Sequence, residues 1–357
     1  MAVGVKARVL YSRLLSTDDY WDLLESDTVA EIGQKLRNTS YGEELDTLPP
    51  IPHRHDLEAA IKDALNAQAE NFLFHLSSPR DKFFKALLYL QEADNLRNVF
   101  RYMVSGRGNR DELRRRLYIS KQSRISYDNV LSARDFMELS EMLRNTQYHK
   151  VLAEPLRRLH TGEERSLFPL EMALDIFVEL SQFKTLKKLE PAERDRLLPI
   201  FGVRADLFNL YILYRTKEFY NMTPEETLNR LMPSRFRVKM PILRELARAE
   251  SGNAVVDMIQ ERFPKYADIF AQTPDDESPH LSMERNIKRY IFLQISRVFR
   301  EEPLGFHTAV SYFTLKKYEI ADIINIIECV RYGYDRRNAA KYLTRPITAA
   351  GGESEWR

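Results

Sequence analysis

The sequence predicts an all-α protein, and three observations support this class. Apolar residues recur at the helical spacing of three and four along nearly the whole chain. Glycine is scarce, at 12 of 357 residues, which disfavours folds that depend on glycine-rich turns and phosphate loops. Strand patterns are weak, since the best of them, residues 236–240, is short enough to be a linker. The length is sufficient for two or three domains with their own cores.

Composition and charge narrow the functional classes. Lys and Arg number 54 and Asp and Glu 52, so the net charge of +2 is not that of a chain that binds polyanions over its whole surface. A single cysteine rules out an internal disulfide and a multi-cysteine metal site. No run approaches the ~18 consecutive apolar residues of a membrane-spanning helix, and Lys6, Arg8 and Arg13 interrupt any secretion signal. We therefore expect a soluble, cytoplasmic protein.

Helical faces and helix starts can be assigned in several segments. Residues 205–215 place apolar side chains on one helix face, and residues 318–333 place isoleucines on more than one, which predicts a deeply buried helix. Thr223 is followed by Pro224 and, at the third helical position, by Glu226, which is the pattern of a capped helix start. Residues 132–135 (Ser-Ala-Arg-Asp) are a weaker version of the same signal.

A short motif recurs three times and ends each time in tyrosine. LRNTSY ends at Tyr41, LRNTQY ends at Tyr148, and a divergent copy, ERFPKY, ends at Tyr266. Each copy follows an amphipathic segment with helical spacing. The interval of roughly 110 residues is too long for solenoid repeats of about 20–50 residues, so each copy marks a larger helical unit.

A second marker, a pair of polar residues three positions apart on an apolar helix, follows each tyrosine. The pairs are Asn95 with Asn98, Asp206 with Asn209, and Asp322 with Asn325. An arginine lies nine positions after the Asp in the second and third copies, at Arg215 and Arg331, and Val104 takes this place in the first. The two markers together predict three related helical units, residues 1–117, 118–233 and 234–357, the last with a C-terminal tail.

The Asp and Asn markers have two interpretations. Carboxylates on an apolar helix are conceivable catalytic groups. Their recurrence at equivalent places favours a structural role, because an active site is rarely built twice in this way. A buried carboxylate must be paired to avoid a cost of several kcal/mol, roughly, so we expect each of these side chains to hydrogen-bond a helix end or a neighbouring turn.

Signatures of common chemistry are absent from the sequence. No glycine precedes a lysine as in a phosphate loop, and neither a GxSxG nor an HExxH motif occurs. Cys329 lies in a very apolar segment and is expected to be a small buried hydrophobe. His53 and His55 lack a helical partner for a metal, and the acidic cluster at 275–277 is expected to be a solvated turn.

The segment 107–124 is strongly basic. Seven basic residues, with Arg114, Arg115 and Arg116 at the centre, oppose two acidic ones, for a net charge of +5. Such a patch suits an anionic partner: nucleic acid, lipid headgroups or an acidic protein. The alternative, a solvated connector between the first two units, is favoured. Aromatic residues are sparse here, which disfavours a platform for single-stranded nucleic acid.

Three segments resemble the C/d-type central-stalk subunit of V-type and A-type ATPases, and together they span nearly the whole chain. Residues 205–233 look like the middle signature of that family, in which an Asp and an Asn lead to Arg-x-Lys and, further on, Leu-x-Pro. Residues 305–333 resemble its last repeat, with Glu-x-x-Asp-x-x-Asn and an ending in Arg-x-Gly. Residues 7–41 are similar to its opening, an Arg-rich first helix and a Leu-x-x-x-x-Tyr helix end.

This resemblance implies a funnel of three similar helical domains around a pseudo-threefold axis. It implies a non-catalytic rotor subunit, one copy per complex, on the cytoplasmic face of the membrane, without cofactor or metal. The funnel would sit on the proteolipid ring and accept the central shaft of subunits D and F. Arg114, Arg115 and Arg116 are then candidate contacts to acidic ring loops or headgroups. Arg215 and Arg331 are further candidates, with helix-end charge stabilisation as the alternative.

Two other classes remain open on the sequence alone. One is a helical nucleic-acid-binding or adaptor protein that uses segment 107–124, although a net charge of +2 and one compact basic stretch make a poor polyanion groove. The other is an all-helical enzyme with a carboxylate-bound metal, which would need acidic pairs on facing helices.

Overall fold

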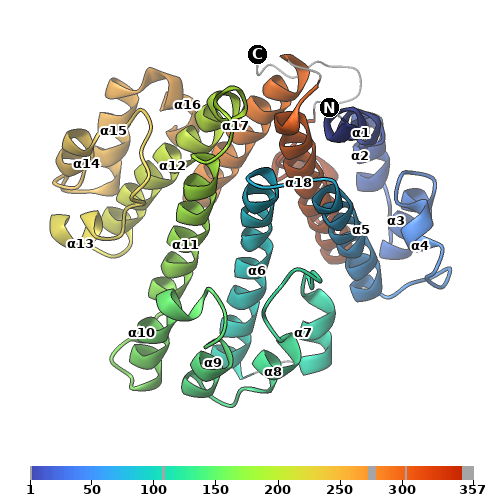
Figure 1. The fold of residues 1–357 in the computed structure, drawn as a ribbon, viewed down its shortest axis with the longest axis horizontal. Helices are drawn as coiled ribbons and strands as arrows, with labels where there is room; N and C mark the ends of the chain where they lie inside the picture. The colour runs from blue at the N-terminus through green and yellow to red at the C-terminus, as the bar shows by residue number, and fades with distance from the viewer. Residues whose placement is uncertain (1, 107–108, 272–278, 302–303, 348–357) are drawn as a thin grey trace. The chain divides into compact units, whose positions relative to one another are not determined.

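The computed structural model describes residues 2–106, 109–271, 279–301 and 304–347, and over these ranges the chain is helical without a β-strand (Figure 1). The predicted all-α class is confirmed. Residues 236–239 form a loop that leads into the next helix, as expected of a linker.

Helices of similar kind recur in the same order along the chain, after an N-terminal helix α1 (Ala2–Tyr11). Each group opens with a short helix, and these are α2 (Thr17–Leu24), α8 (Tyr127–Ser132) and α14 (Met240–Leu246). The helix that precedes each marker tyrosine comes next, namely α3 (Val29–Arg37), α9 (Phe136–Met142) and α15 (Gly252–Arg262). The helices that follow the tyrosines are α4 (Gly42–Leu45), α10 (His149–His160) and α16 (Ala267–Phe270), the last after a 3-10 turn, Pro264–Tyr266.

Two long helices and one short helix complete each group. The first long helices are α5 (Arg54–Phe74), α11 (Phe168–Leu186) and α17 (Pro279–Glu301). The second are α6 (Arg80–Ser105), α12 (Pro191–Glu218) and α18 (Phe306–Tyr332). The short ones are α7 (Arg110–Arg116), α13 (Pro224–Leu228) and α19 (Arg336–Lys341). This order agrees with a threefold repeat, while the boundaries at 117 and 233 and the funnel stay predictions.

Helix starts follow from capping chemistry. Thr223 caps α13 in a full capping box with Glu226, as the sequence predicts. The start predicted at residues 132–135 begins at the last of these residues, because Asp135 accepts hydrogen bonds from the backbone N–H groups of Met137 and Glu138. Ser132 instead ends α8, where its hydroxyl donates to the carbonyl of Asn129.

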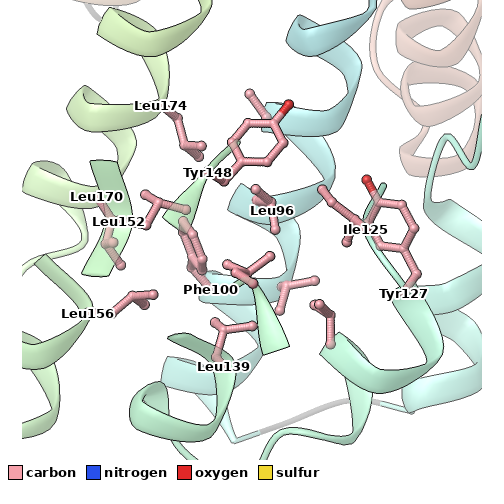
Figure 2. Packing of buried hydrophobic residues seen from close by; sticks show 14 of the residues in the cluster. Leu96, Phe100, Ile125, Tyr127, Leu139, Tyr148, Leu152, Leu156, Leu170 and Leu174 are labelled. Atoms are coloured by element: carbon pink, nitrogen blue, oxygen red, sulfur yellow. The ribbon is translucent and has the colours of Figure 1, made fainter. Parts of the chain in front are cut away.

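The chain forms two compact units, each with a core of its own. One comprises Ser12–Leu189 and Val330–Gly333. Its core lies where α6 packs along α11, and Figure 2 shows the Tyr148 ring between Leu96 of α6 and Leu174 of α11. Leu96, Leu174 and Phe100 are fully buried, while Tyr89 and Phe177, whose rings contact that of Tyr148, are partly buried.

The other unit comprises Met1–Tyr11, Glu190–Cys329 and Tyr334–Arg357. In it α12 packs against α15 and α17, and α1 joins α17 through Tyr11, whose ring stacks on that of Phe299 with 4.0 Å between centroids. Among the described helices, one, α12, is long and apolar enough by length and composition to cross a membrane. Within its most apolar 18-residue window, 78% of residues are buried inside the protein, which is typical of a core helix.

Candidate functional site

Asp206 holds a stretch of backbone after α13. Its carboxylate is fully buried and accepts hydrogen bonds from the N–H groups of Phe236, Arg237 and Val238, at 2.9, 2.6 and 3.1 Å. Burial raises the pKa of Asp206, and the three hydrogen bonds act against that rise. The hydrogen bonding predicted for this residue is confirmed, and its partners are backbone groups 30–32 residues further along the chain.

Asn209 and Asn95 make the same contact in different parts of the chain. The N–H of Met232 donates to Asn209 Oδ1 at 2.6 Å, while Asn209 Nδ2 donates to the Met232 carbonyl at 3.3 Å. Asn95 binds both backbone groups of Tyr118 in the same way, at 2.8 and 2.7 Å. In both cases the partner lies 23 residues further along. Asn95 Nδ2 also contacts the hydroxyl of Tyr127 at 2.9 Å.

Asp322 has the corresponding role on α18. It is fully buried and accepts hydrogen bonds from the N–H groups of Thr344 and Arg345, at 2.7 and 2.9 Å. Burial raises its pKa to about 6, against the effect of these hydrogen bonds. The second long helices thus carry buried polar residues that hold the chain just after the following short helix, one each on α6 and α18 and two on α12.

The hydrogen bonds align the first two copies differently from their spacing. Spacing pairs Asn95 with Asp206, whereas the contacts pair Asn95 with Asn209, three residues later. Asn95 matches Asn209 by its contact, and Asp322 matches both by the distance of 22–23 residues to its partner, although it accepts consecutive N–H groups as Asp206 does. Asn98 is half-buried and Asn325 is exposed, so neither repeats the contact of Asn209.

The signal that would have found this register is an acidic residue three positions earlier. Glu92, Asp206 and Glu319 precede Asn95, Asn209 and Asp322, and all three acidic side chains are buried. Glu319 pairs with Lys316 at 2.8 Å. Sequence reasoning missed Glu92, whose Oε2 accepts hydrogen bonds from the Tyr148 hydroxyl at 2.6 Å and from Gln147 Nε2 at 3.2 Å.

The marker tyrosines are buried, at 1% exposed for Tyr41, 0% for Tyr148 and 2% for Tyr266. The first two copies repeat their backbone geometry closely. The hydroxyls of Thr39 and Thr146 each donate to the carbonyl of the residue three positions earlier and accept from the tyrosine N–H. The motif therefore encodes one specific turn between two helices.

The pKa of Asp322 predicts a pH-dependent stability. Because its folded-state pKa of about 6 exceeds the ordinary value of 3.8, the folded protein binds the proton more tightly. This stabilisation is complete below about pH 4 and is lost as the pH rises through 6, at a cost of at most about 3 kcal/mol. The unaltered protein should therefore be more stable at pH 5 than at pH 7 by the contribution of Asp322. We expect Asp322→Asn, which cannot ionise, to remove this contribution, as measured by urea denaturation at the two pH values. Asp257→Asn, at an exposed position on α15, is the control and should leave the difference unchanged.

The three central arginines of the basic segment lie on or at the end of α7 and are about half exposed. Each has a carboxylate partner. Arg114 pairs with Asp128, Arg116 with Glu112, and Arg115 Nη1 lies 3.9 Å from Asp56 Oδ1.

Carboxylates from outside the segment lie beside its basic side chains and weaken the positive field around it. Besides Asp56 and Asp128, Glu70 lies 3.4 Å from Lys121 Nζ. The end of α7 is fixed by Lys62, which is 7% exposed and donates to the Arg116 carbonyl at 2.8 Å. The arginines thus lie on an anchored helix and in a field weaker than the composition of the segment predicts.

Arg215 and Arg331 both lie in the last turn of a long helix. The Arg215 guanidinium lies over the ring of Tyr211, 5.6 Å from its centroid, and that of Arg331 over Tyr332 at 5.0 Å. The side chain of Arg215 is half-buried and that of Arg331 is exposed. A cation in the last turn stabilises the negative end of the helix dipole.

The other candidates have no site geometry. His53 is exposed, and His55 Nε2 lies 2.7 Å from Glu112 Oε1. Within the described ranges no group of three or more His, Cys, Asp or Glu side chains could hold a metal ion, and residues 275–277 lie outside those ranges. Cys329 is half-buried, less than expected, and burial raises the pKa of its thiol.

The described residues thus form an all-helical protein of recurring helix groups, in which buried polar side chains of the long helices hold the loops that follow. Residues 3–342 match the ATP synthase (C/AC39) subunit family, and the chain belongs to that family.

Two curated relatives, both C subunits of A-type ATP synthases, are similar over most of their length. The protein of Pyrococcus abyssi is 22% identical over 335 residues, which cover 92% of this chain and 86% of the relative. The protein of Methanosarcina mazei is 20% identical over 319 residues, which cover 89% and 85%.

Proposed function

We propose that this chain is a non-catalytic rotor subunit that couples the central shaft of an A-type or V-type ATPase to its membrane ring. The single observation that supports this most strongly is the family match over residues 3–342, because it includes every helix group rather than one motif. The curated relatives carry the name of the C subunit of an A-type ATP synthase, which implies a place in a membrane-associated complex.

The internal construction of the chain suits a part that carries torque. Long helices are joined by loops that are tied back to them through buried Asp206, Asn209, Asn95 and Asp322. Such fully satisfied buried polar contacts oppose local unfolding of the loops. We propose the proteolipid ring and the shaft subunits D and F as partners, one copy of the chain per complex, a peripheral position on the cytoplasmic face, and no nucleic acid.

A pull-down of the tagged protein from gently solubilised native membranes tests this function. Mass spectrometry should identify the proteolipid and the shaft subunits among the proteins recovered. Recovery of nucleic acid, or of the chain without any ATPase subunit, would contradict the proposal.

A charge-reversal variant tests the role of the basic segment in ring binding. Arg114, Arg115 and Arg116 are half exposed, and replacing all three with Glu should weaken binding to the purified ring by roughly tenfold at low salt and reduce its dependence on salt. Binding is measured by surface plasmon resonance at two salt concentrations.

A matched control reverses three other exposed arginines that also pair with carboxylates, Arg144, Arg157 and Arg158. It should bind the ring as the unaltered protein does. Equal binding by the test variant at both salt concentrations would remove segment 107–124 from the interface without affecting the family assignment.

A further inference from the structure

A polar cavity of about 340 Å³ lies within the unit that contains α6 and α11. This volume is within the range of small-molecule sites. Side chains of α6, of the loop from Tyr118 to Arg124, and Gln147 line it. None of the predicted contact arginines lines it, and Tyr118, whose backbone Asn95 holds, lies at its border.

The described lining is rich in hydrogen-bond donors. Lys85 and Arg124 bring two positive charges, and Arg124 makes no ion pair with any residue that the structure describes. Gln91 is 2% exposed, and its Nε2 has no hydrogen-bond partner in the described chain. A buried amide donor without a partner costs free energy of about 1–3 kcal/mol, so a turn of the Gln91 side chain that brings Nε2 to an acceptor in the cavity would be favourable.

The carboxylate among the lining residues does not supply that acceptor. Glu92 is 5% exposed, and its Oε2 already accepts from Tyr148 and Gln147. Burial raises the pKa of Glu92, and the hydrogen bond from Tyr148 acts against that rise. The cavity therefore offers the guanidinium of Arg124, the ammonium of Lys85, which lies 3.7 Å from Asp81 Oδ2, and the amide of Gln91.

We propose that this cavity binds a small organic molecule that carries a phosphoryl or carboxylate group. Arg124 and Lys85 contact the oxyanion, since a guanidinium and an ammonium are the usual partners of both groups. Gln91 Nε2 donates to a further oxygen of the ligand. This binding is independent of the coupling function proposed above, and the chain can bind the ligand whether or not it joins a rotor.

Isothermal titration calorimetry on the full chain tests the proposal with four probes: inorganic phosphate, glycerol 3-phosphate, succinate and uncharged glycerol. We expect at least one anionic probe to bind at a ratio of one to one and glycerol not to bind. Binding of the phosphorylated probes identifies a phosphoryl site, and binding of succinate identifies a carboxylate site. Absence of binding by every anionic probe overturns the proposal.

Three variants locate the site. Arg124→Gln removes one cation at an exposed position and should weaken binding at least tenfold, and Gln122→Trp should block the cavity from its exposed rim. Arg144→Gln, an exposed arginine that pairs with Glu141 and does not line the cavity, should bind within about twofold of the unaltered protein. Unchanged affinity in both cavity variants, with thermal midpoints showing that they are folded, overturns the assignment.

Discussion

Asp206→Ala should lower the free energy of unfolding by about 3 kcal/mol, one of the two largest effects that we expect from a single substitution in this chain. The variant removes the acceptor of three backbone N–H groups, those of Phe236, Arg237 and Val238. Val238 is fully buried, so its N–H would have no replacement partner. Arg237 is exposed, so water can hydrogen-bond its N–H in the variant. The expected loss of stability is therefore smaller than the cost of leaving all three N–H groups without a partner.

Urea denaturation measures this loss, and two controls separate its causes. Asp206→Asn keeps one acceptor oxygen and should lose roughly half as much. Asp257→Ala removes an exposed carboxylate from α15 and should change stability by less than about 0.5 kcal/mol. A loss below about 1 kcal/mol in Asp206→Ala would show that the loop after α13 does not depend on this carboxylate.

The same residue shows how far sequence reasoning extends. Its position on an apolar helix predicted a hydrogen-bonded side chain, and this is confirmed. Its partners could not be predicted, because they are backbone groups 30–32 residues away whose side chains share no pattern. A backbone donor has no residue identity, so only the fold reveals which stretch of chain a buried carboxylate holds.

Which residues of the repeated units are equivalent was harder to predict from the sequence. An Asn95–Asn98 pair looks like the Asp206–Asn209 pair by spacing, whereas the hydrogen bonds equate Asn95 with Asn209. Asn and Asp both accept a backbone N–H, so identity alone does not distinguish the two alignments. The burial of Glu92 would have decided between them, because a carboxylate on the core face requires a partner as Asp206 does.

The charge pattern of segment 107–124 led to an overestimate. Counting residues in 107–124 overstated the positive field, because Asp56, Glu70 and Asp128 lie elsewhere in sequence and beside the segment in space. The all-helical class was predictable because apolar periodicity is local and needs no knowledge of distant contacts. Ion pairs between distant segments and the cavity around Gln91 depend on the packing of several helices, which no single stretch of sequence encodes.

Tyr148→Ala should lower the free energy of unfolding by about 4 kcal/mol, because it combines two losses. The ring is fully buried, lies 4.9 Å from that of Phe177 between centroids, and fills the space between α6 and α11 (Figure 2). Deleting a buried aromatic ring costs about 3–5 kcal/mol through lost transfer energy and the cavity left behind. The hydroxyl also donates to buried Glu92, which would lose its shorter hydrogen bond.

Tyr148→Phe separates the two contributions, since it keeps the ring and removes only the donor. We expect it to lose about 1–2 kcal/mol, because Gln147 still donates to Glu92. Tyr332→Ala, at a tyrosine that is 64% exposed, is the matched control and should be nearly neutral. Chemical denaturation followed by circular dichroism gives all three values. If Tyr148→Phe were as damaging as Tyr148→Ala, the marker tyrosine would act through its hydrogen bond, and the motif would have recurred for its hydroxyl rather than for its ring.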